Sequence, residues 1–509
     1  RRAPLPDLSR LHTAELTMSA ALDAGKVDLR ETIPLKLLDA CVIGGPGDRY
    51  RLYDFGKLYS GFLLAELEAE EESELLIGWD ELLIHGAWDP HRAYWANNFL
   101  RLRLPAGRRI AFESFEPYAI RCAAFAVLQG RIRIHRVSLR EYAFDASRFL
   151  PRRNTRFSRP LSAVYSAACE TFRQNCVDLF MDCPGRERAA WLCDSFFMAE
   201  AEFFLTGRTD VEDDFLENFI LPERYPLPEP WMIPMCFPAD NPRNSFLPQW
   251  PFWLFLEIFE KKRERGGIDF TEAIRPRFFK FLNGCEHYLN REGFLENLPG
   301  WNFIEWSRAE EFFQGVHFPT NMLYARCLQE GGTLYGDSAL RERGERLREK
   351  LLHDAFDGAW FHDNAVWSNG ELVRSGNISE ICQYYADFCL SPHPGVPAFA
   401  AWRQRLLDGS RLENLVPAAM FIGLILRFRT LLAAGRNEQF LRESTAKLLP
   451  MTAETGTLWE KETPTASCCH GFASVLAPML QAATAACGTG QFPAAPVEKN
   501  GVPVYIMKK

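Results

Sequence analysis

The hydrophobic period of the chain changes once, near residue 150, and this change limits the folds that the chain can adopt. Before it, polar and apolar residues alternate, as in the runs 51–55, 99–104 and 131–140. A period of two is typical of half-buried antiparallel strands. After about residue 155, apolar residues recur with the period of a helix until about residue 487. The sequence therefore predicts a β domain followed by an α domain.

Ten stretches of the second part have the length and the period of helices. They cover residues 161–179, 187–205, 251–265, 274–290, 320–330, 338–356, 379–390, 418–434, 438–449 and 469–486. The loops between them, such as 221–244 and 297–302, are rich in Pro, Gly and Asn and are longer than a plain bundle needs. Roughly ten to twelve helices are predicted, and they fit either a closed ring of helical hairpins or an α-solenoid.

The patterns divide the chain into three units. We expect a β-sandwich domain over residues 1–152, a helical domain over 153–487, and a short tail over 488–509 that adds at most one edge strand. With 509 residues, 47% of them hydrophobic, the chain is long enough to bury more than one core.

Composition excludes several kinds of partner. A net charge of -8 leaves no basic field for nucleic acid. No apolar run is long enough to span a membrane, and the first residues are not followed by the apolar core of a secretory signal. We expect a soluble protein, either cytoplasmic or, after removal of a signal, periplasmic or secreted.

The 14 cysteines lack the paired spacings of disulfide scaffolds and zinc sites. The oligomeric state stays open.

One short run, residues 182–197 with the sequence DCPGRERAAWLCDSFF, is unusually polar for its surroundings. Its Pro-Gly pair marks a turn, so a helix is predicted to begin near Arg186. Glu187, Trp191 and Asp194 would then share one helix face at positions i, i+4 and i+7. The rest of this helix is apolar, and an aspartate within it needs a partner or a ligand.

The polar side chains of this run can form a pocket for acid–base chemistry. They are Asp182, Arg186, Glu187, Trp191 and Asp194. An arginine, Arg186 or Arg188, can pair with one carboxylate, while crowding of like charges raises the pKa of another. A carboxyl group that stays protonated near neutral pH is what a general acid requires. A capping and salt-bridge cluster explains the same residues, so both interpretations stay open at this point.

Two further segments place acids beside indole rings. Glu460 lies in the run GTLWEKE, in a predicted loop before an apolar helix, and His470 stands at the start of that helix. Trp301, Glu305 and Trp306 follow a Pro-Gly turn. Sugar-binding clefts combine ring faces with carboxylates in this way, although exposed acids and core aromatics give the same pattern.

Other chemistries lack their residues. The chain has no Gly-rich phosphate loop, no HExxH and no GxSxG, which argues against nucleotide, zinc-protease and serine-hydrolase sites. The run Cys468-Cys469-His470 leaves a thiol nucleophile as an alternative, but at most one of two adjacent cysteines can face the histidine. We therefore expect no metal and no cofactor.

The motif DCPGRERAAWLCD resembles the signature of glycoside hydrolase family 78, the bacterial α-L-rhamnosidases. In that family an Asp-Cys-Pro-x-Arg run leads to Glu-Arg, then Trp, then Asp, and this chain follows the same order. The segment 457–460 with His470 resembles the second motif, which supplies the other catalytic acid. Glu305-Trp306 stands where the family usually has Asp-Trp. The runs 53–61, 79–82 and 115–121 resemble the β-sandwich that precedes the catalytic domain.

The resemblance implies a jelly-roll-like β-sandwich followed by an (α/α)6 barrel that releases terminal α-L-rhamnose with inversion. Glu187 would protonate the glycosidic oxygen, and Glu460 would activate water from the opposite ring face. Such a pair lies ~6.5 to 9.5 Å apart in inverting enzymes. The resemblance also implies a set of sugar-binding residues: Asp182, Arg186, Trp191, Asp194, Trp301, Glu305, Trp306 and His470.

The resemblance has gaps that leave other functions open. Gly185 replaces the commoner Gln, and the family's C-terminal β-sandwich is absent or reduced to residues 488–509. The partner is expected to be a rhamnose-containing glycan or glycoside. The alternatives are a carbohydrate-binding protein that has lost catalysis, and an enzyme acting on a related deoxy or uronic sugar.

Overall fold

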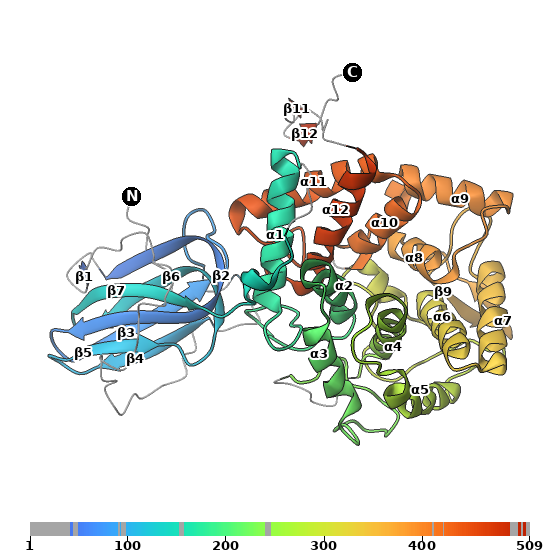
Figure 1. The fold of residues 1–509 in the computed structure, drawn as a ribbon, viewed down its shortest axis with the longest axis horizontal. Coiled ribbons are helices and arrows are strands. Elements are labelled where there is room, and N and C mark those ends of the chain that lie inside the picture. Colours follow the sequence, from blue (N-terminus) through green and yellow to red (C-terminus); the bar gives the residue numbers. More distant parts are fainter. Residues whose placement is uncertain are drawn as a thin grey trace.

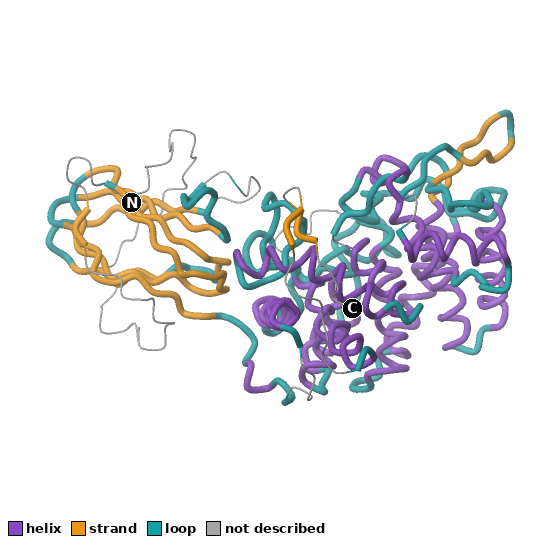
Figure 2. Tube along the Cα trace, turned by 90° about the horizontal axis from the view of Figure 1, so that it is seen from above, coloured by secondary structure: helices purple, strands orange, loops and turns teal. Residues whose placement is uncertain are grey.

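A computed structural model of the chain describes residues 41–43, 49–89, 92, 98–151, 157–239, 246–409, 412–420, 422–488, 497–499 and 502–504. An antiparallel sheet comes first and a set of helices follows it, which confirms the predicted order (Figure 1). Seen from above, the strands of the N-terminal sheet lie together at one end of the molecule and the helices lie at the other (Figure 2). None of the helices in the described residues is long and apolar enough to cross a membrane.

Seven strands form the N-terminal sheet, in the order β1-β7-β2-β6-β3-β4, with β5 also paired to β2. They are β1 (Cys41–Ile43), β2 (Tyr50–Ala69), β3 (Ser73–Asp80), β4 (Phe99–Leu104), β5 (Arg109–Glu113), β6 (Tyr118–Gln129) and β7 (Ile132–Glu141). The first part of β2 pairs with β6, and its last part pairs with β7 and β5. Because β2 continues through both parts, the described strands form one half-barrel rather than the two separate sheets of the predicted sandwich.

Alternating side chains from six of these strands fill one core inside the half-barrel, with Leu63, Ile77 and Phe125 fully buried. The alternation in β7 shifts once. The pairing with β2 skips His135, so that the apolar side chains buried before the shift are Ile132 and Ile134 and those after it are Val137 and Leu139. A bulge of this kind explains why the alternation of this run in the sequence is imperfect.

Twelve α-helices lie in the described part of the helical domain. They are α1 (Arg159–Asn175), α2 (Asp194–Thr206), α3 (Asp210–Ile220), α4 (Trp250–Glu260), α5 (Thr271–Glu286), α6 (Phe318–Leu334), α7 (Ser338–Asp354), α8 (Glu380–Tyr385), α9 (Pro397–Asp408), α10 (Ile422–Ala433), α11 (Asn437–Glu454) and α12 (Leu476–Ala486). Each of the ten predicted stretches overlaps one of them. The sequence did not predict α3, which is rich in acids, or α9, which begins at a proline.

The even-numbered helices pack in sequence. Helix α2 contacts α4, α4 contacts α6, α6 contacts α8, and α8 contacts α10. Helix α12, the last helix of the domain in the sequence, packs against the first two, α1 and α2. All eleven residues of α4 are buried, so this helix lies inside the domain. The first and last helices of the domain are therefore neighbours.

Two small sheets complete the described part of the fold. The strands β8 (Val316–His317), β9 (Asn364–Ser368) and β10 (Glu371–Arg374) form a second sheet, and the β9–β10 hairpin projects from the helical domain (Figure 2). In the tail, β11 (Val497–Lys499) and β12 (Val502–Val504) pair with each other, where one edge strand was predicted. The rest of the tail and residues 1–40 lie outside the described residues, and the domain limits at 152 and 487 remain a prediction.

The cysteines from Cys122 to Cys487 are all unpaired, and all are buried except Cys169 and Cys487, which are half-buried. Burial raises the pKa of thiols such as Cys183 and Cys468 well above the usual range.

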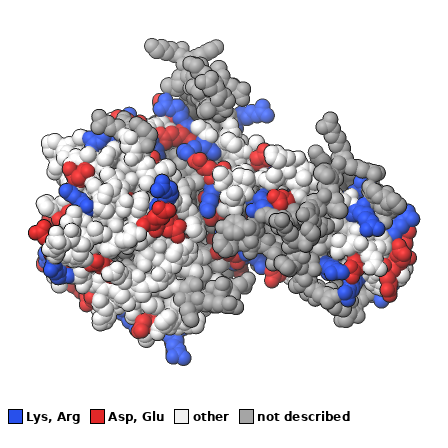
Figure 3. All heavy atoms as spheres, turned by 180° about the vertical axis from the view of Figure 1, so that it is seen from behind, with Lys and Arg blue, Asp and Glu red and all other residues white. Residues whose placement is uncertain are grey.

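On the face drawn in Figure 3, basic and acidic side chains are interspersed over the described surface.

Candidate active site

One cavity in the helical domain brings together side chains from separate parts of the sequence. The cavity is partly open to solvent and has about 370 Å³ of empty space, the space at its opening included. Its lining consists of Asp182, Arg186, Glu187, Trp191, Asp194, Leu247, Trp250, Trp301, Phe303, Trp306, Glu460 and His470. Nine of the ten residues that the sequence singled out therefore meet at one place.

A larger hollow lies beside the β9–β10 hairpin and contains none of the predicted residues. Its charged side chains pair with one another. Lys350 Nζ lies 3.1 Å from Glu292 Oε2, and His362 Nε2 lies 3.0 Å from Asp357 Oδ2. These groups satisfy one another, so the smaller cavity is the better candidate for chemistry.

Residues 182–193 form a loop, and the predicted helix start near Arg186 is wrong. Helix α2 begins only at Asp194. Two hydrogen bonds close the loop: the Asp182 N–H donates to Ala189 O at 3.0 Å, and the Ala189 N–H donates to Asp182 Oδ1 at 2.9 Å. Asp182 therefore fixes the shape of the loop with its own side chain.

The backbone after this closure pairs with a remote segment instead of forming a helical turn. The Leu192 N–H donates to Met235 O at 2.9 Å. Arg188 and Cys193 have φ angles of +52° and +74°, which interrupt a right-handed helix. The prediction that Glu187, Trp191 and Asp194 share one helix face is therefore wrong, because only Asp194 lies in the helix. The segment that takes up these hydrogen bonds lies over forty residues further along the chain, where local periodicity gives no sign of it.

The two acids with predicted catalytic roles share one cation. Arg186 Nη2 lies 3.0 Å from Glu187 Oε1 and 3.2 Å from Glu460 Oε2. The Trp191 indole N–H donates to Glu187 Oε2 at 2.7 Å. The Glu187 side chain is 35% exposed and that of Glu460 is 2% exposed. Glu187 therefore lies toward the open side of the cavity and Glu460 lies toward its buried side.

The loop that carries Glu460 folds back on itself and is held by hydrogen bonds between its two arms. The Glu460 N–H donates to Ser467 O at 3.0 Å, and the Ser467 N–H donates to Glu460 Oε2 at 3.3 Å. His470 precedes a 3-10 turn over Gly471–Val475, and α12 follows. The prediction of a loop before an apolar helix, with His470 at the helix start, is confirmed.

Three further side chains that line the cavity are polar and buried. Burial and the neighbouring Glu187 raise the pKa of Asp182 to about 8. Burial, with Asp182 and Glu460 nearby, raises the pKa of Asp194 well above its usual range. Burial lowers the pKa of His470 well below its usual range. Burial thus favours the neutral form of each of the three groups, which suits hydrogen bonding to neutral hydroxyl groups.

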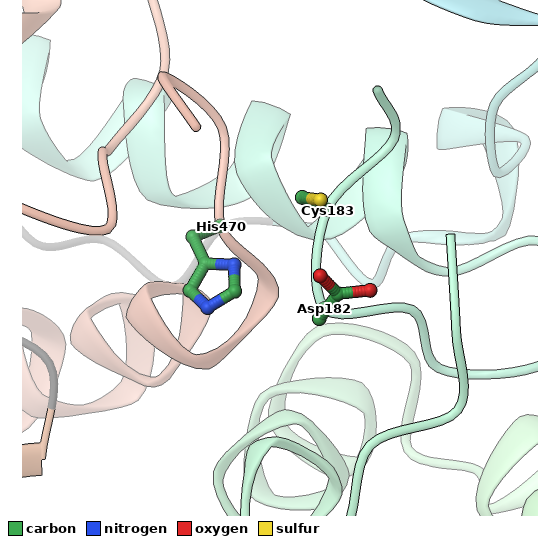
Figure 4. A group of neighbouring side chains, drawn as sticks. All are labelled: Asp182, Cys183 and His470. Carbon is green, nitrogen blue, oxygen red and sulfur yellow. The ribbon is translucent and has the colours of Figure 1, made fainter. Parts of the chain in front are cut away.

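Asp182, Cys183 and His470 have ligand atoms within 4.8 Å of one another, and they come from two separate segments (Figure 4). A metal would need the Cys183 thiolate, yet burial raises the pKa of that thiol well above the usual range. Asp182 Oδ1 is also engaged by Ala189. The chemistry of this donor set fits hydrogen bonding better than metal binding.

Aromatic rings form part of the wall of the cavity. The ring centres of Trp301 and Trp306 lie 5.6 Å apart, and those of Phe303 and Trp306 lie 4.7 Å apart. Trp301 is 37% exposed, so it lies at the rim. A lining that combines apolar rings with carboxylates matches the two kinds of surface that a pyranose offers. The sequence missed Leu247, Trp250 and Phe303, which are indistinguishable from core residues by pattern.

Glu305 is the predicted residue that does not line the cavity. Its side chain is fully buried, and Oε1 accepts a hydrogen bond from the Ala419 N–H at 2.7 Å. A Cβ built on Gly423 would lie 2.2 Å from Glu305 Oε2. Burial raises its pKa to about 8. Neighbouring Trp306 takes the cavity side, so Glu305 points away and anchors the segment before α10.

Comparisons with known proteins identify a related domain within this chain. Residues 158–370 match the sequence model of the family described as the bacterial alpha-L-rhamnosidase 6 hairpin glycosidase domain. The match includes the loop at 182–193 and the aromatic wall, and it ends before Glu460 and His470. No curated protein sequence matches the chain.

Several solved structures share the fold. The GH78 family rhamnosidase of Bacillus sp. GL1 has a TM-score of 0.75 at 20% identity, over 88% of this chain and 47% of that one. A rhamnosidase from Klebsiella oxytoca with rhamnose bound has a TM-score of 0.65 at 16% identity, over 84% and 86%. An alpha-L-rhamnosidase of Streptomyces avermitilis complexed with L-rhamnose has a TM-score of 0.61 at 13% identity, over 86% and 43%.

The chain spans about half the length of the Bacillus and Streptomyces proteins and most of the Klebsiella protein. The family match and the shared fold point in the same direction as the motif at residue 182. Residues 158–370 therefore match the bacterial alpha-L-rhamnosidase six-hairpin glycosidase domain, and the chain shares the fold of a glycoside hydrolase family 78 rhamnosidase.

Proposed function

We propose that the chain is a glycosidase that removes terminal α-L-rhamnose from glycans or glycosides with inversion of configuration. One observation carries this proposal. Glu187 and Glu460, far apart in the sequence, converge on the same nitrogen of Arg186 in one cavity. Two carboxyl groups facing one space are the machinery of glycoside hydrolysis.

The exposure of the two acids supports their roles. Glu187, on the open side, would protonate the glycosidic oxygen, because the leaving group must exit toward solvent. Glu460, on the buried side, would take a proton from the water that attacks the anomeric carbon. Its carboxylate accepts hydrogen bonds from Arg186 Nη2 and the Ser467 N–H. Arg186 contacts both acids and would hold them in place before the substrate binds.

The remaining lining would bind the sugar. Asp182, Asp194 and His470 are placed to hydrogen-bond the ring hydroxyls, and Trp191, Trp301 and Trp306 to contact the apolar face and the methyl group. The small volume of the cavity supports binding of one terminal residue. Rhamnose bound to the Klebsiella and Streptomyces proteins supports rhamnose as this sugar.

We also propose that the helices form an (α/α)6 barrel. The packing order α2–α4–α6–α8–α10, with α12 beside α2, supports a closed ring. In an open solenoid the first and last helices would lie apart. A ring places loops from distant parts of the sequence at one end of the domain, as the cavity requires.

The test is the stereochemistry and the acid dependence of hydrolysis. With an aryl α-L-rhamnoside, we expect proton NMR to detect β-L-rhamnose before mutarotation. E187Q and E460Q should each lower kcat by about 10²- to 10⁴-fold. E311Q is the control, because Glu311 lies outside the cavity and its side chain is 67% exposed.

Other outcomes would point elsewhere. Release of α-L-rhamnose first would contradict inversion. Saturable binding of L-rhamnose without any product would identify a sugar-binding protein. Hydrolysis of another deoxy or uronic glycoside, but not of rhamnosides, would identify a related activity on the same site.

A further inference from the structure

Glu81 reaches from the sheet domain to the loop that carries Glu460. It follows β3, and its side chain is 6% exposed. Glu81 Oε2 accepts a hydrogen bond from the Cys468 N–H at 2.7 Å, and the Ser467 hydroxyl donates to Glu81 Oε1 at 3.4 Å. A single carboxylate from the N-terminal domain thus contacts two successive residues of this loop.

Ser467 connects Glu81 to the acid that we assign as the base. Its N–H donates to Glu460 Oε2, and its carbonyl accepts from the Glu460 N–H. One residue therefore stands between the two carboxylates. If Ser467 moves, the N–H group that donates a hydrogen bond to the Glu460 carboxylate moves with it.

The Glu81 carboxylate also lies against the other active-site loop, at Gly185. A Cβ built on Gly185 would lie 2.7 Å from Glu81 Oε1 and 3.1 Å from Ala119 Cβ. Both are closer than ordinary contacts, so a side chain at position 185 would displace Glu81. Gly185 stands two residues before Glu187. The absence of a side chain there gives Glu81 the space between the two loops.

Arg92 holds the Glu81 side chain in this position. Its Nη2 lies 3.2 Å from Glu81 Oε2 and 2.6 Å from Asp80 Oδ1. Its Nη1 donates to the carbonyls of Pro464 and Ala466, at 2.8 and 3.1 Å. The cluster therefore fixes Glu81 and the loop with the same guanidinium, and alternative rotamers of Glu81 would break charge-assisted hydrogen bonds.

We propose that Glu81 is a positioning residue that sets the separation between Glu187 and Glu460. Glu81 does not line the cavity, so it acts through the two loops. Separation matters because the attacking water must fit between the acids. A misplacement of about 1 Å can cost about 10²-fold in rate. The kinetic part of this inference rests on the proposed function.

The first test measures kcat and KM for E81A on an aryl α-L-rhamnoside, together with Kd for L-rhamnose. We expect kcat to fall by about 10- to 100-fold while KM and Kd stay within about threefold, because the sugar-binding side chains remain. E81Q should recover most of kcat, since its amide oxygen can still accept from the Cys468 N–H. E74Q is the matched control: Glu74 lies near the other end of β3 and pairs with Arg101 and Arg103.

A double-mutant cycle tests the contact with Gly185. G185A alone should lower kcat, because its Cβ pushes Glu81 from its place. In the E81A background the same substitution should have a much smaller effect, since the displaced group is gone. Additive effects of the two substitutions would overturn the inference, as would equal losses of kcat and L-rhamnose affinity in E81A.

Crystal structures separate this inference from the proposed function. We expect the distance between the Glu187 and Glu460 carboxyl carbons to differ between the wild type and E81A. If the wild type hydrolyses no rhamnoside and this distance still changes, the proposed function fails and the positioning role stands. If the distance and kcat are both unchanged in soluble, folded E81A, the positioning role is wrong. G185A provides the same measurement if E81A does not fold.

Discussion

Burial sets the charge of single side chains in the cavity. Burial and neighbouring carboxylates raise the pKa values of Asp182 and Asp194 and so favour their protonated forms. Arg186 is the cation that faces both Glu187 and Glu460. The raised pKa values thus belong to the two aspartates, which suits them to binding a neutral sugar.

Asp182 should make the stability of the protein depend on pH. Its pKa is about 8 in the fold and about 3.9 in an unfolded chain, so the native state binds the proton more tightly. The stabilisation is complete below about pH 4 and is lost as the pH rises through about 8. D182N stays neutral and can still accept from the Ala189 N–H. We expect its melting temperature, relative to the wild type, to rise between pH 5 and 9.

Differential scanning fluorimetry across this pH range measures the effect. D178N is the control, because Asp178 lies in the same region of the chain and is exposed. Parallel pH curves for D182N and the wild type would show that Asp182 ionises normally in the fold.

At the residue scale, chemistry-bearing motifs were easier to predict than side-chain directions. The sequence identified nine cavity residues because carboxylates, indoles and a histidine cluster in short runs. It misplaced Glu305, since no periodicity in a loop tells which of two neighbours, Glu305 or Trp306, faces the cavity. Leu247 and Phe303 carry no polar group that would mark them.

At the scale of elements, a carboxylate joins helices α2 and α3. Glu202, buried on α2, accepts hydrogen bonds from the N–H groups of Val211 and Glu212, both at 2.9 Å. These N–H groups belong to the first turn of α3 and have no partner within that helix. A side chain from the preceding helix therefore caps α3.

Removal of this cap should loosen the junction of the two helices. We expect E202A to lower the free energy of unfolding by about 1 to 3 kcal/mol, because two buried N–H groups lose their acceptor. The midpoint of urea unfolding, followed by circular dichroism, measures this. E217A, on α3 and away from its first turn, should leave the midpoint unchanged. Equal midpoints for both variants would show that water replaces Glu202 at no cost.

Helix existence was predictable, and helix starts were not. Ten apolar-periodic stretches coincide with helices, because burial of one face dominates their sequence. The start of α2 was wrong by eight residues, since remote backbone at Met235 takes the hydrogen bonds of the preceding loop. Helix α3 was missed because its acids obscure the period, and its cap comes from another helix.

At the scale of the whole molecule, the sheet domain and the helical domain share buried contacts. The Leu58 N–H donates to Thr455 O at 2.9 Å, and the Gln174 amide donates to Leu58 O at 2.9 Å. Arg92 links Asp80 to the loop before Ser467. The order of the two domains was predictable from the period of the sequence. Their contacts were not, because each joins residues more than a hundred positions apart.

Arg92 should couple the unfolding of the two domains. Asp80 and Arg92 are both buried, and burial raises the pKa of Asp80 to about 6 even beside the guanidinium. Removal of one partner of a buried ion pair costs about 3 to 5 kcal/mol. We expect calorimetry to record one unfolding transition for the wild type and a lower, split transition for R92A. R103A, an exposed arginine of the same sheet, is the control and should keep the single transition. Identical traces for R92A and R103A would place the coupling elsewhere.

The buried cysteines give the molecule built-in reporters of its own opening. Cys183 follows the residue that closes one active-site loop, and Cys468 lies on the other, against Glu81. An alkylating reagent reaches either sulfur only when its surroundings separate, and the raised pKa of both thiols keeps them unreactive until then. The labelling rate of each cysteine can be measured by mass spectrometry. It therefore reports how often the loop that carries that cysteine opens.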